Sequence, residues 1–134
     1  MTIHRIILPG VLCAMATAPA ATAEGEPLAV PSGLAVQLHD LVRAQSDAPG
    51  LYRMRFVAPE IAADGTDFDG VVADMDYLCA QVALPHLADS IPAPERIIIT
   101  LMSTPTDFGL ANPAVTQFFE SYSIKNDLCI WEAF

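Results

Sequence analysis

The sequence is poor in positive charge, because 6 Lys and Arg residues stand against 16 Asp and Glu in 134 residues, a formal net charge of −10. A protein that binds nucleic acid through its phosphates needs a basic surface, so this balance argues against nucleic acid as a partner. Attachment to an anionic membrane surface is disfavoured for the same reason.

Catalytic and metal-binding motifs are also missing. Histidine occurs only three times, and neither His39 nor His86 belongs to a recognisable triad or metal pattern. We interpret His86 as a surface residue or a donor at a helix end. Neither G-x-S-x-G nor S-x-x-K occurs in the chain. The sequence therefore predicts no catalytic residue, no cofactor and no metal ligand.

Five Asp residues between positions 64 and 76 form the densest acidic cluster. The cluster matches the calcium loop of an EF-hand only in part, because Gly65 takes the first ligand position and Asp76 takes that of the bidentate Glu. We interpret the acids as helix capping instead, since the segment Thr66–Asp69 fits a capping box. A weak calcium or magnesium site is the alternative.

Residues 1–23 have the three parts of a secretory signal peptide: His4 and Arg5, an apolar stretch over 6–20, and Ala-Thr-Ala at 21–23. The stretch contains Pro9, Gly10 and Pro19 and is too short for a membrane span. The sequence predicts cleavage after Ala23, a single domain over residues 24–134 and a periplasmic or secreted protein. No later segment predicts stable membrane insertion.

Cleavage of the leader would remove Cys13 and leave two cysteines, Cys79 and Cys129. In an oxidising compartment, two cysteines predict one disulfide. A metal or redox pair is the alternative, but these two residues lie far apart and form no C-x-x-C motif.

Two segments near the start of the predicted domain alternate between apolar and polar residues with the period of a β-strand. They are residues 34–39 and 52–56, with the turn-forming sequence SDAPG at 46–50 between them. We therefore expect a β-hairpin.

From Phe68 to Val82 the apolar residues recur at three- and four-residue steps, which predicts an amphipathic helix. Cys79 falls on its apolar face, whereas Asp74 falls on its polar face. Pro85 marks the expected end.

The segment RIIITLM at 96–102 contains a continuous run of β-branched residues, as in a central strand buried on both faces. Residues 113–122 fit either a helix that begins at Pro113 or a strand. We favour a hairpin that turns at Asn126-Asp127 and places Cys129 and Trp131 on one face. The expected fold is α+β, a mostly antiparallel sheet of about five strands packed on one main helix with one disulfide.

Several stretches resemble a family of small exported proteins of alphaproteobacteria that is classed as a domain of unknown function. They are RFVAPEI, DMDYLC, RIIITL, TQFFESYSI and CIWEAF, and the similarity covers most of residues 28–134. The resemblance implies export and the cysteine pair, and it implies no activity, cofactor or active site.

The predicted first hairpin holds the sole concentration of basic residues, Arg43, Arg53 and Arg55, with His39 on the expected outward face. Paired arginines recognise a carboxylate or phosphate group with two hydrogen bonds, so this patch is a candidate site for a small anionic ligand. The alternative is ion pairing with acids on neighbouring strands, such as Glu132.

Phe118, Phe119 and Tyr122 are candidate interaction aromatics. A hairpin with two faces cannot bury both Phe118 and Phe119 against one helix, so the second face is a candidate contact for a protein partner or another copy of the chain. The oligomeric state is left open.

The sequence thus favours an exported, non-catalytic periplasmic module that binds a ligand or another protein. The alternative is a small envelope hydrolase or other enzyme, with a site assembled from scattered polar residues such as His39, Arg53, Arg55 and Glu120.

Overall fold

The computed structural model describes residues 25–43 and 47–133, which form a five-stranded sheet with a helix against it. The predicted leader and residues 44–46 of the first turn lie outside this range. The strands are adjacent in chain order: β1 Gln37–Arg43, β2 Leu51–Val57, β3 Arg96–Met102, β4 Gln117–Lys125 and β5 Leu128–Glu132. The pair β2–β3 is parallel and the other three pairs are antiparallel. The predicted α+β class with a mostly antiparallel sheet is confirmed.

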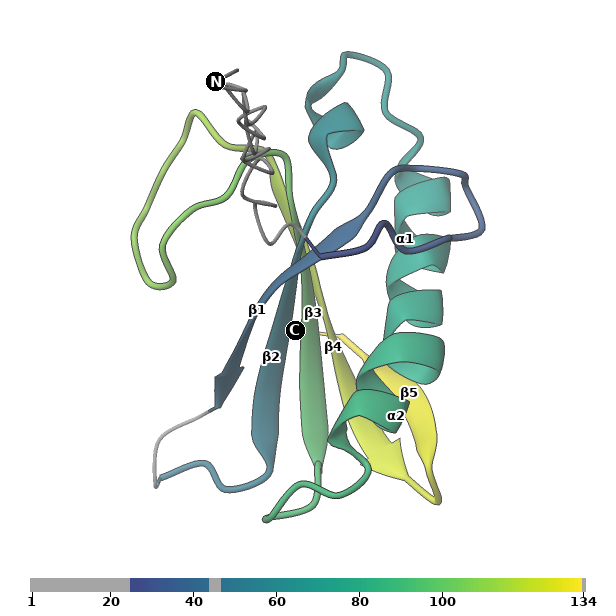
Figure 1. The fold of residues 1–134 in the computed structure, drawn as a ribbon, viewed down its shortest axis with the longest axis vertical. Coiled ribbons are helices and arrows are strands. Elements are labelled where there is room, and N and C mark those ends of the chain that lie inside the picture. The colour runs from purple at the N-terminus through teal and green to yellow at the C-terminus, as the bar shows by residue number, and fades with distance from the viewer. Residues whose placement is uncertain (1–24, 44–46, 134) are drawn as a thin grey trace, which may run out of the picture.

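A continuous helical segment over residues 68–87 connects β2 to β3 and covers one face of the sheet (Figure 1). It consists of α1 Phe68–Tyr77, a wider π-helical stretch Leu78–Ala83 and α2 Leu84–Leu87, and a 3₁₀ turn, Pro59–Ala62, precedes it. Two adjacent parallel strands need a crossover of this kind. We call the sheet face under the helix the helix face and the opposite one the open face.

The main hydrophobic core lies between the helix and the sheet. β2 and β3 contribute every second side chain to it, as the alternation of the sequence predicts. Its fully buried members include Met54, Phe56, Val71, Met75, Leu78, Leu87, Ile97, Ile99 and Leu101. Central β3 is also largely buried on its open face, where Ile98 is half-buried and Thr100 is buried.

The first hairpin is confirmed, but its first strand lies further along the chain than expected. β1 begins at Gln37, and a bulge between Leu38 and Asp40 makes His39 an extra, exposed residue. Val36, expected inside the strand, instead forms an isolated bridge with Leu28. Because a bulge shifts the alternation by one residue, the period-two pattern could not be continued through it.

The helix starts at Phe68 as expected, but its cap and its end differ from the expected ones. The capping box is absent, because Asp67 makes no side-chain cap and the Thr66 hydroxyl donates to the carbonyls of Ile61 and Ala63. Pro85 does not end the helix. The helical backbone continues through Leu84, and Pro85 stands in the first turn of α2, directly after the π-helical stretch.

Asp74 is fully buried, whereas the sequence placed it on the polar face of the helix. Its Oδ1 accepts the backbone N–H of Ser32 at 2.9 Å, and its Oδ2 accepts the Ser32 hydroxyl. The N-terminal segment runs beside α1 (Figure 1) and covers this carboxylate. Hydrogen bonds to a distant segment explain how a charged residue is buried there.

The tail forms the β4–β5 hairpin, so the strand interpretation of residues 117–122 is confirmed and the helical one is wrong. Asn126 and Asp127 both have positive φ, 52° and 58°, as a type I′ turn requires. The segment 103–116 between β3 and β4 is a long loop on the open face, opposite α1 (Figure 1). Its ends are joined by the Ser103 N–H, which donates to the Thr116 carbonyl at 2.9 Å.

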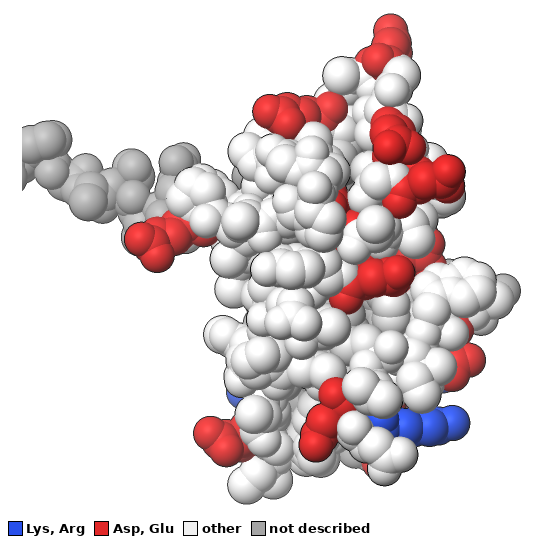
Figure 2. Space-filling model, turned by 90° about the vertical axis from the view of Figure 1, so that its right-hand side faces the viewer, with Lys and Arg blue, Asp and Glu red and all other residues white. Residues whose placement is uncertain are grey.

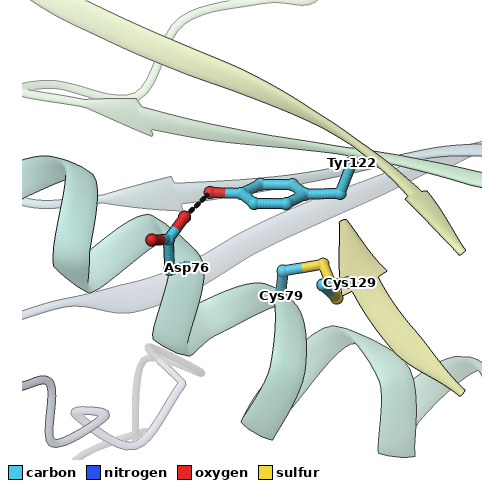
Figure 3. The surroundings of a disulfide bond; sticks show 4 residues. All are labelled: Asp76, Cys79, Tyr122 and Cys129. Carbon is cyan, nitrogen blue, oxygen red and sulfur yellow. Dashed lines mark hydrogen bonds between the residues drawn. A yellow bond between two sulfur atoms is a disulfide. The ribbon is translucent and has the colours of Figure 1, made fainter. Parts of the chain in front are cut away.

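The predicted disulfide between Cys79 and Cys129 is confirmed, with an S–S distance of 2.03 Å. It joins the π-helical stretch to edge strand β5. Figure 3 shows the buried Tyr122 beside it, with its phenol directed at Asp76 on the helix. The Tyr122 hydroxyl donates to Asp76 Oδ1 at 2.6 Å, so the sheet and helix are tied at two neighbouring points.

Burial, and then the hydrogen bond to the Asp76 carboxylate, raise the pKa of Tyr122 well above its ordinary value of 10.0. The folded protein therefore keeps the phenol neutral at a pH where the unfolded chain ionises it. The resulting stability is complete below pH 10 and is lost as the pH rises towards the folded pKa.

Tyr122→Phe is therefore expected to be less stable than the parent by about 1 kcal/mol at pH 7, where the hydrogen bond is lost, and to become the more stable protein above about pH 11. Each pH unit above 10 costs the parent about 1.4 kcal/mol. Urea unfolding between pH 7 and 11.5 measures both effects, and Tyr77→Phe, on the exposed helix surface, is the control. Parallel pH curves for the parent and Tyr122→Phe would contradict the expectation.

Candidate functional site

The open face of the sheet carries two arginines, Arg53 and Arg55, at alternate positions of β2. The register places Arg55 between Asp40 on β1 and Thr100 on β3. Arg53 instead lies between Val42 and Ile98, which are both apolar. The two arginines therefore have different electrostatic surroundings, although they are only two residues apart.

Arg55 is a structural residue, because only 4% of it is exposed and both terminal nitrogens of its guanidinium have partners. Its Nη1 donates to Asp40 Oδ2 at 2.8 Å, and its Nη2 contacts Met102 Sδ at 3.1 Å and donates to the Thr106 carbonyl. Arg55 thereby connects β1 and β3 to the 103–116 loop. This fixes one end of the loop over the open face.

Arg53 is half-buried and, among the described residues, makes no ion pair. Its guanidinium lies 5.4 Å from the centre of the Phe108 ring, and that of Arg55 lies 5.7 Å from the same ring. An aromatic face stabilises a cation without neutralising it. Arg53 therefore keeps its positive charge available for a ligand in a protein that is otherwise strongly acidic.

The two arginines line a cleft of about 270 Å³ between the sheet and the 103–116 loop. We call it the arginine cleft. Its remaining walls combine apolar side chains with a few polar groups, a composition common in ligand sites. The lining residues are Arg53, Arg55, Ile98, Thr100, Asp107, Phe108, Gly109, Leu110, Gln117 and Phe119.

The other members of the predicted basic patch do not line this cleft. Arg43 is paired with Tyr52 in the register and lies over its ring at 5.8 Å, on the helix face. His39, at the bulge, borders a neighbouring hollow with Thr106 and Asp107, and its Nε2 lies 4.0 Å from Asp40 Oδ2. The structure thus brings together Arg53 and Arg55 and separates them from Arg43.

Glu132 is not the ion-pair partner that the sequence suggested. It lies on β5, three strands away from β2, and accepts a hydrogen bond from the Ser123 hydroxyl at 2.7 Å. Asp40 takes the role instead. Its Oδ1 is buried and has no hydrogen-bond partner, so Oδ2 alone accepts the hydrogen bond from Arg55.

The three candidate aromatics lie in different places. Phe118 is half-buried on the helix face, where its ring meets that of Phe68 edge-on at 5.8 Å. Phe119 lies on the open face, 57% exposed, at the rim of the arginine cleft. Tyr122 is buried and contacts the helix. Of the three, Phe119 belongs to the cleft.

The four polar residues suggested for an enzyme do not all line one pocket. Glu120 lies opposite Ile99 in the register and hence on the helix face, where it accepts the Trp131 indole N–H at 2.6 Å. Arg53 and Arg55 lie on the other face of the sheet, and His39 borders a separate hollow with Thr106 and Asp107. A catalytic group needs hydrogen-bond reach to the others, which this arrangement does not give.

The helix side of the molecule offers a different surface. Figure 2 shows acidic groups spread over it and little basic surface. A hollow of about 490 Å³ at the start of α1 is lined by Glu60, Asp64 and Asp67 and by no basic residue. Within residues 25–43 and 47–133, no group of three His, Cys, Asp or Glu is arranged to hold a metal, and no helix is long and apolar enough to cross a membrane.

Comparison with known proteins gives one positive result. A family model described as a family of unknown function, DUF6497, matches residues 11–134. The chain belongs to DUF6497. The match covers every strand and the helix. The predicted membership of a family of unknown function is therefore confirmed. The comparisons with curated proteins and with solved structures found no match.

Sequence reasoning missed three parts of this DUF6497 site: Asp40, Phe108 and the loop that carries Phe108. His39-Asp40 carried no recognisable motif, and only the bulge sets Asp40 opposite Arg55. Phe108 lies among Gly, Pro and polar residues, which predict a loop but not its position. The one usable signal was the unusual pair of arginines in an acidic chain.

Proposed function

We propose that this DUF6497 protein is an exported, non-catalytic binding module that holds the anionic group of a small ligand against Arg53 in the arginine cleft. The observation that carries the proposal is the half-buried Arg53 guanidinium, which stacks on Phe108 and has no ion pair among the described residues. Burying a guanidinium without a counter-charge is unfavourable, and an anionic ligand removes that cost.

The position of the acids supports the proposal. The helix layer, about 10 Å thick, separates the acids on its outer surface from the open face. The acids of the helix surface and the arginine cleft therefore lie on opposite sides of the sheet. Of the carboxylates that the structure describes, Asp107 is the one that lines the cleft.

Export is the second part of the proposal and is supported by the signal-like sequence of residues 1–23 and by the disulfide, since disulfides form and persist in oxidising compartments. Intact-mass analysis of the protein recovered from its own cells tests it. We expect a chain that starts at Glu24 and gains two hydrogens on reduction. A chain that retains residues 1–23 would contradict export.

Binding is tested by titrating isotope-labelled protein with acetate, phenylacetate and inorganic phosphate while amide chemical shifts are followed. We expect saturable shifts around the arginine cleft for at least one of these anions, and Arg53→Gln should weaken that binding about tenfold or more. Arg43→Gln is the matched control, because Arg43 also stacks on an aromatic ring but lies on the helix face. Equal affinity in the parent and Arg53→Gln would remove the proposal.

A further inference from the structure

The charges that line the arginine cleft favour a ligand with a single negative charge over one with two. Two guanidinium groups are present, but the charge of Arg55 is already neutralised by Asp40 at 2.8 Å. Asp107 adds a carboxylate to the lining. A doubly charged anion would therefore face one uncompensated arginine and one repelling carboxylate, whereas a carboxylate group can take the planar fork of Arg53 with two hydrogen bonds.

Next to the arginines, the walls are apolar. Ile98, Phe108, Leu110 and Phe119 line the same space, and the last three expose more than half of their surface. Exposed large apolar groups gathered around one charged group indicate a ligand that is apolar at one end and charged at the other. Inorganic phosphate would leave this apolar surface in contact with water.

The size and rigidity of the cleft complete the argument. At about 270 Å³, it lies just below the range of about 300–1,000 Å³ for drug-sized ligands, which suits one ring or a short branched chain. The loop that forms the outer wall is held by Arg55 at Thr106 and by the Thr116 N–H, which donates to Ser103 Oγ at 3.0 Å. Both ends of the wall are therefore held before a ligand binds.

We propose that the cleft binds a small monocarboxylate with an apolar body, such as an aromatic ring, with the carboxylate on Arg53 and the ring against Leu110 and Phe119. This inference rests on the proposed function and specifies the ligand of the same site.

The first test compares four probes on the full chain with its disulfide intact: phenylacetate, acetate, phenylacetamide and inorganic phosphate. Phenylacetate should bind most tightly. Acetate should bind about tenfold or more weakly because it lacks the ring, and phenylacetamide about tenfold more weakly because it lacks the charge. Phosphate should bind at least about tenfold more weakly than phenylacetate, since it carries more charge and no apolar part.

Three variants and one control variant, Leu128→Ser, then assign the contacts. Leu110→Ser should weaken phenylacetate about threefold or more, whereas Leu128→Ser should not change its affinity. The two leucines are 63% and 62% exposed, and only Leu110 lines the cleft. Asp107→Asn should tighten phenylacetate about two- to fivefold because it removes a like charge. Arg53→Gln should abolish the preference for phenylacetate over phenylacetamide.

The outcomes separate this inference from the proposed function. Arg53-dependent binding of phosphate that is tighter than that of phenylacetate would overturn the carboxylate ligand and leave the binding module. Weaker binding of phenylacetate by Asp107→Asn would also overturn it, since Asp107 would then support the bound anion instead of repelling it. The absence of Arg53-dependent binding by any probe would overturn both.

Discussion

Replacing Cys79 and Cys129 together with alanine is expected to lower the free energy of unfolding by about 4 kcal/mol. The two residues are 50 positions apart, so the bond restricts a long loop of the unfolded chain, and the loss of that restriction favours unfolding. A small domain has a net stability of only about 5–15 kcal/mol, so a large share of the total depends on this one bond.

The bond also holds an element that has few other attachments. β5 is an edge strand of five residues, and β4 is its single neighbour in the sheet. Cys129 ties this strand to the π-helical stretch at Cys79, which is itself fully buried. We expect the amide protons of β5 to exchange faster in the double variant than in the parent, because an edge strand without the bond opens locally.

Urea unfolding followed by circular dichroism, with and without reductant, measures the effect. The parent should lose stability on reduction and the double variant should not respond. The two experiments separate the effect of losing the bond from the effect of losing the sulfur atoms. Reduction breaks the bond but keeps the sulfur atoms, whereas alanine also removes their volume. If free thiols are verified by mass and the parent keeps its unfolding midpoint, the loop-closure explanation is wrong.

The parts of the fold that the sequence predicted are those with a strong local pattern. Residues 96–102 are apolar almost throughout and became the central strand, and the helical period from Phe68 became α1. Asn126-Asp127 tolerates positive φ and formed the turn. Cys79 and Cys129 could be paired because only two cysteines follow the predicted leader. Each of these conclusions needed only neighbouring residues or a count.

The parts that failed depend on contacts between distant segments. β1 was placed too early because the bulge beside His39 interrupts the alternation. Asp74 was assigned to solvent, since the helical period cannot show that Ser32 covers it. The end of the helix was placed at Pro85, although the helical backbone continues through Leu84 into α2. Tertiary structure overrode the local signal in each case.

For the site, the sequence identified Arg53 and Arg55 as unusual but could not tell them apart. Their difference arises from the register, which places Asp40 opposite Arg55 and Val42 opposite Arg53. The cleft itself depends on where the 103–116 loop lies, and no periodic pattern describes a loop. Composition can therefore point to the two arginines as candidate ligand-binding residues. Only the fold shows that Arg53 is the one without an ion pair among the described residues.

The pair of Asp40 and Arg55 leads to the second large prediction, a difference between its two members. Asp40→Asn leaves the Arg55 guanidinium without a counter-charge at 4% exposure, and we expect a loss of about 3 kcal/mol in the free energy of unfolding. Arg55→Met leaves a carboxylate that is 37% exposed and can be hydrated, so the expected loss is smaller, about 1–2 kcal/mol. Urea unfolding of the two single variants measures this difference.

The double variant Asp40→Asn with Arg55→Met provides the control, because it removes both charges. If the cost of Asp40→Asn comes from an uncompensated buried charge, adding Arg55→Met must restore stability, so the double variant should be more stable than Asp40→Asn alone. Losses that simply add would show that the two side chains contribute separately, through packing and through the hydrogen bond to Thr106. The sign of the coupling therefore decides whether Asp40 stabilises the fold by neutralising Arg55, which is the condition that leaves Arg53 as the free cation of the cleft.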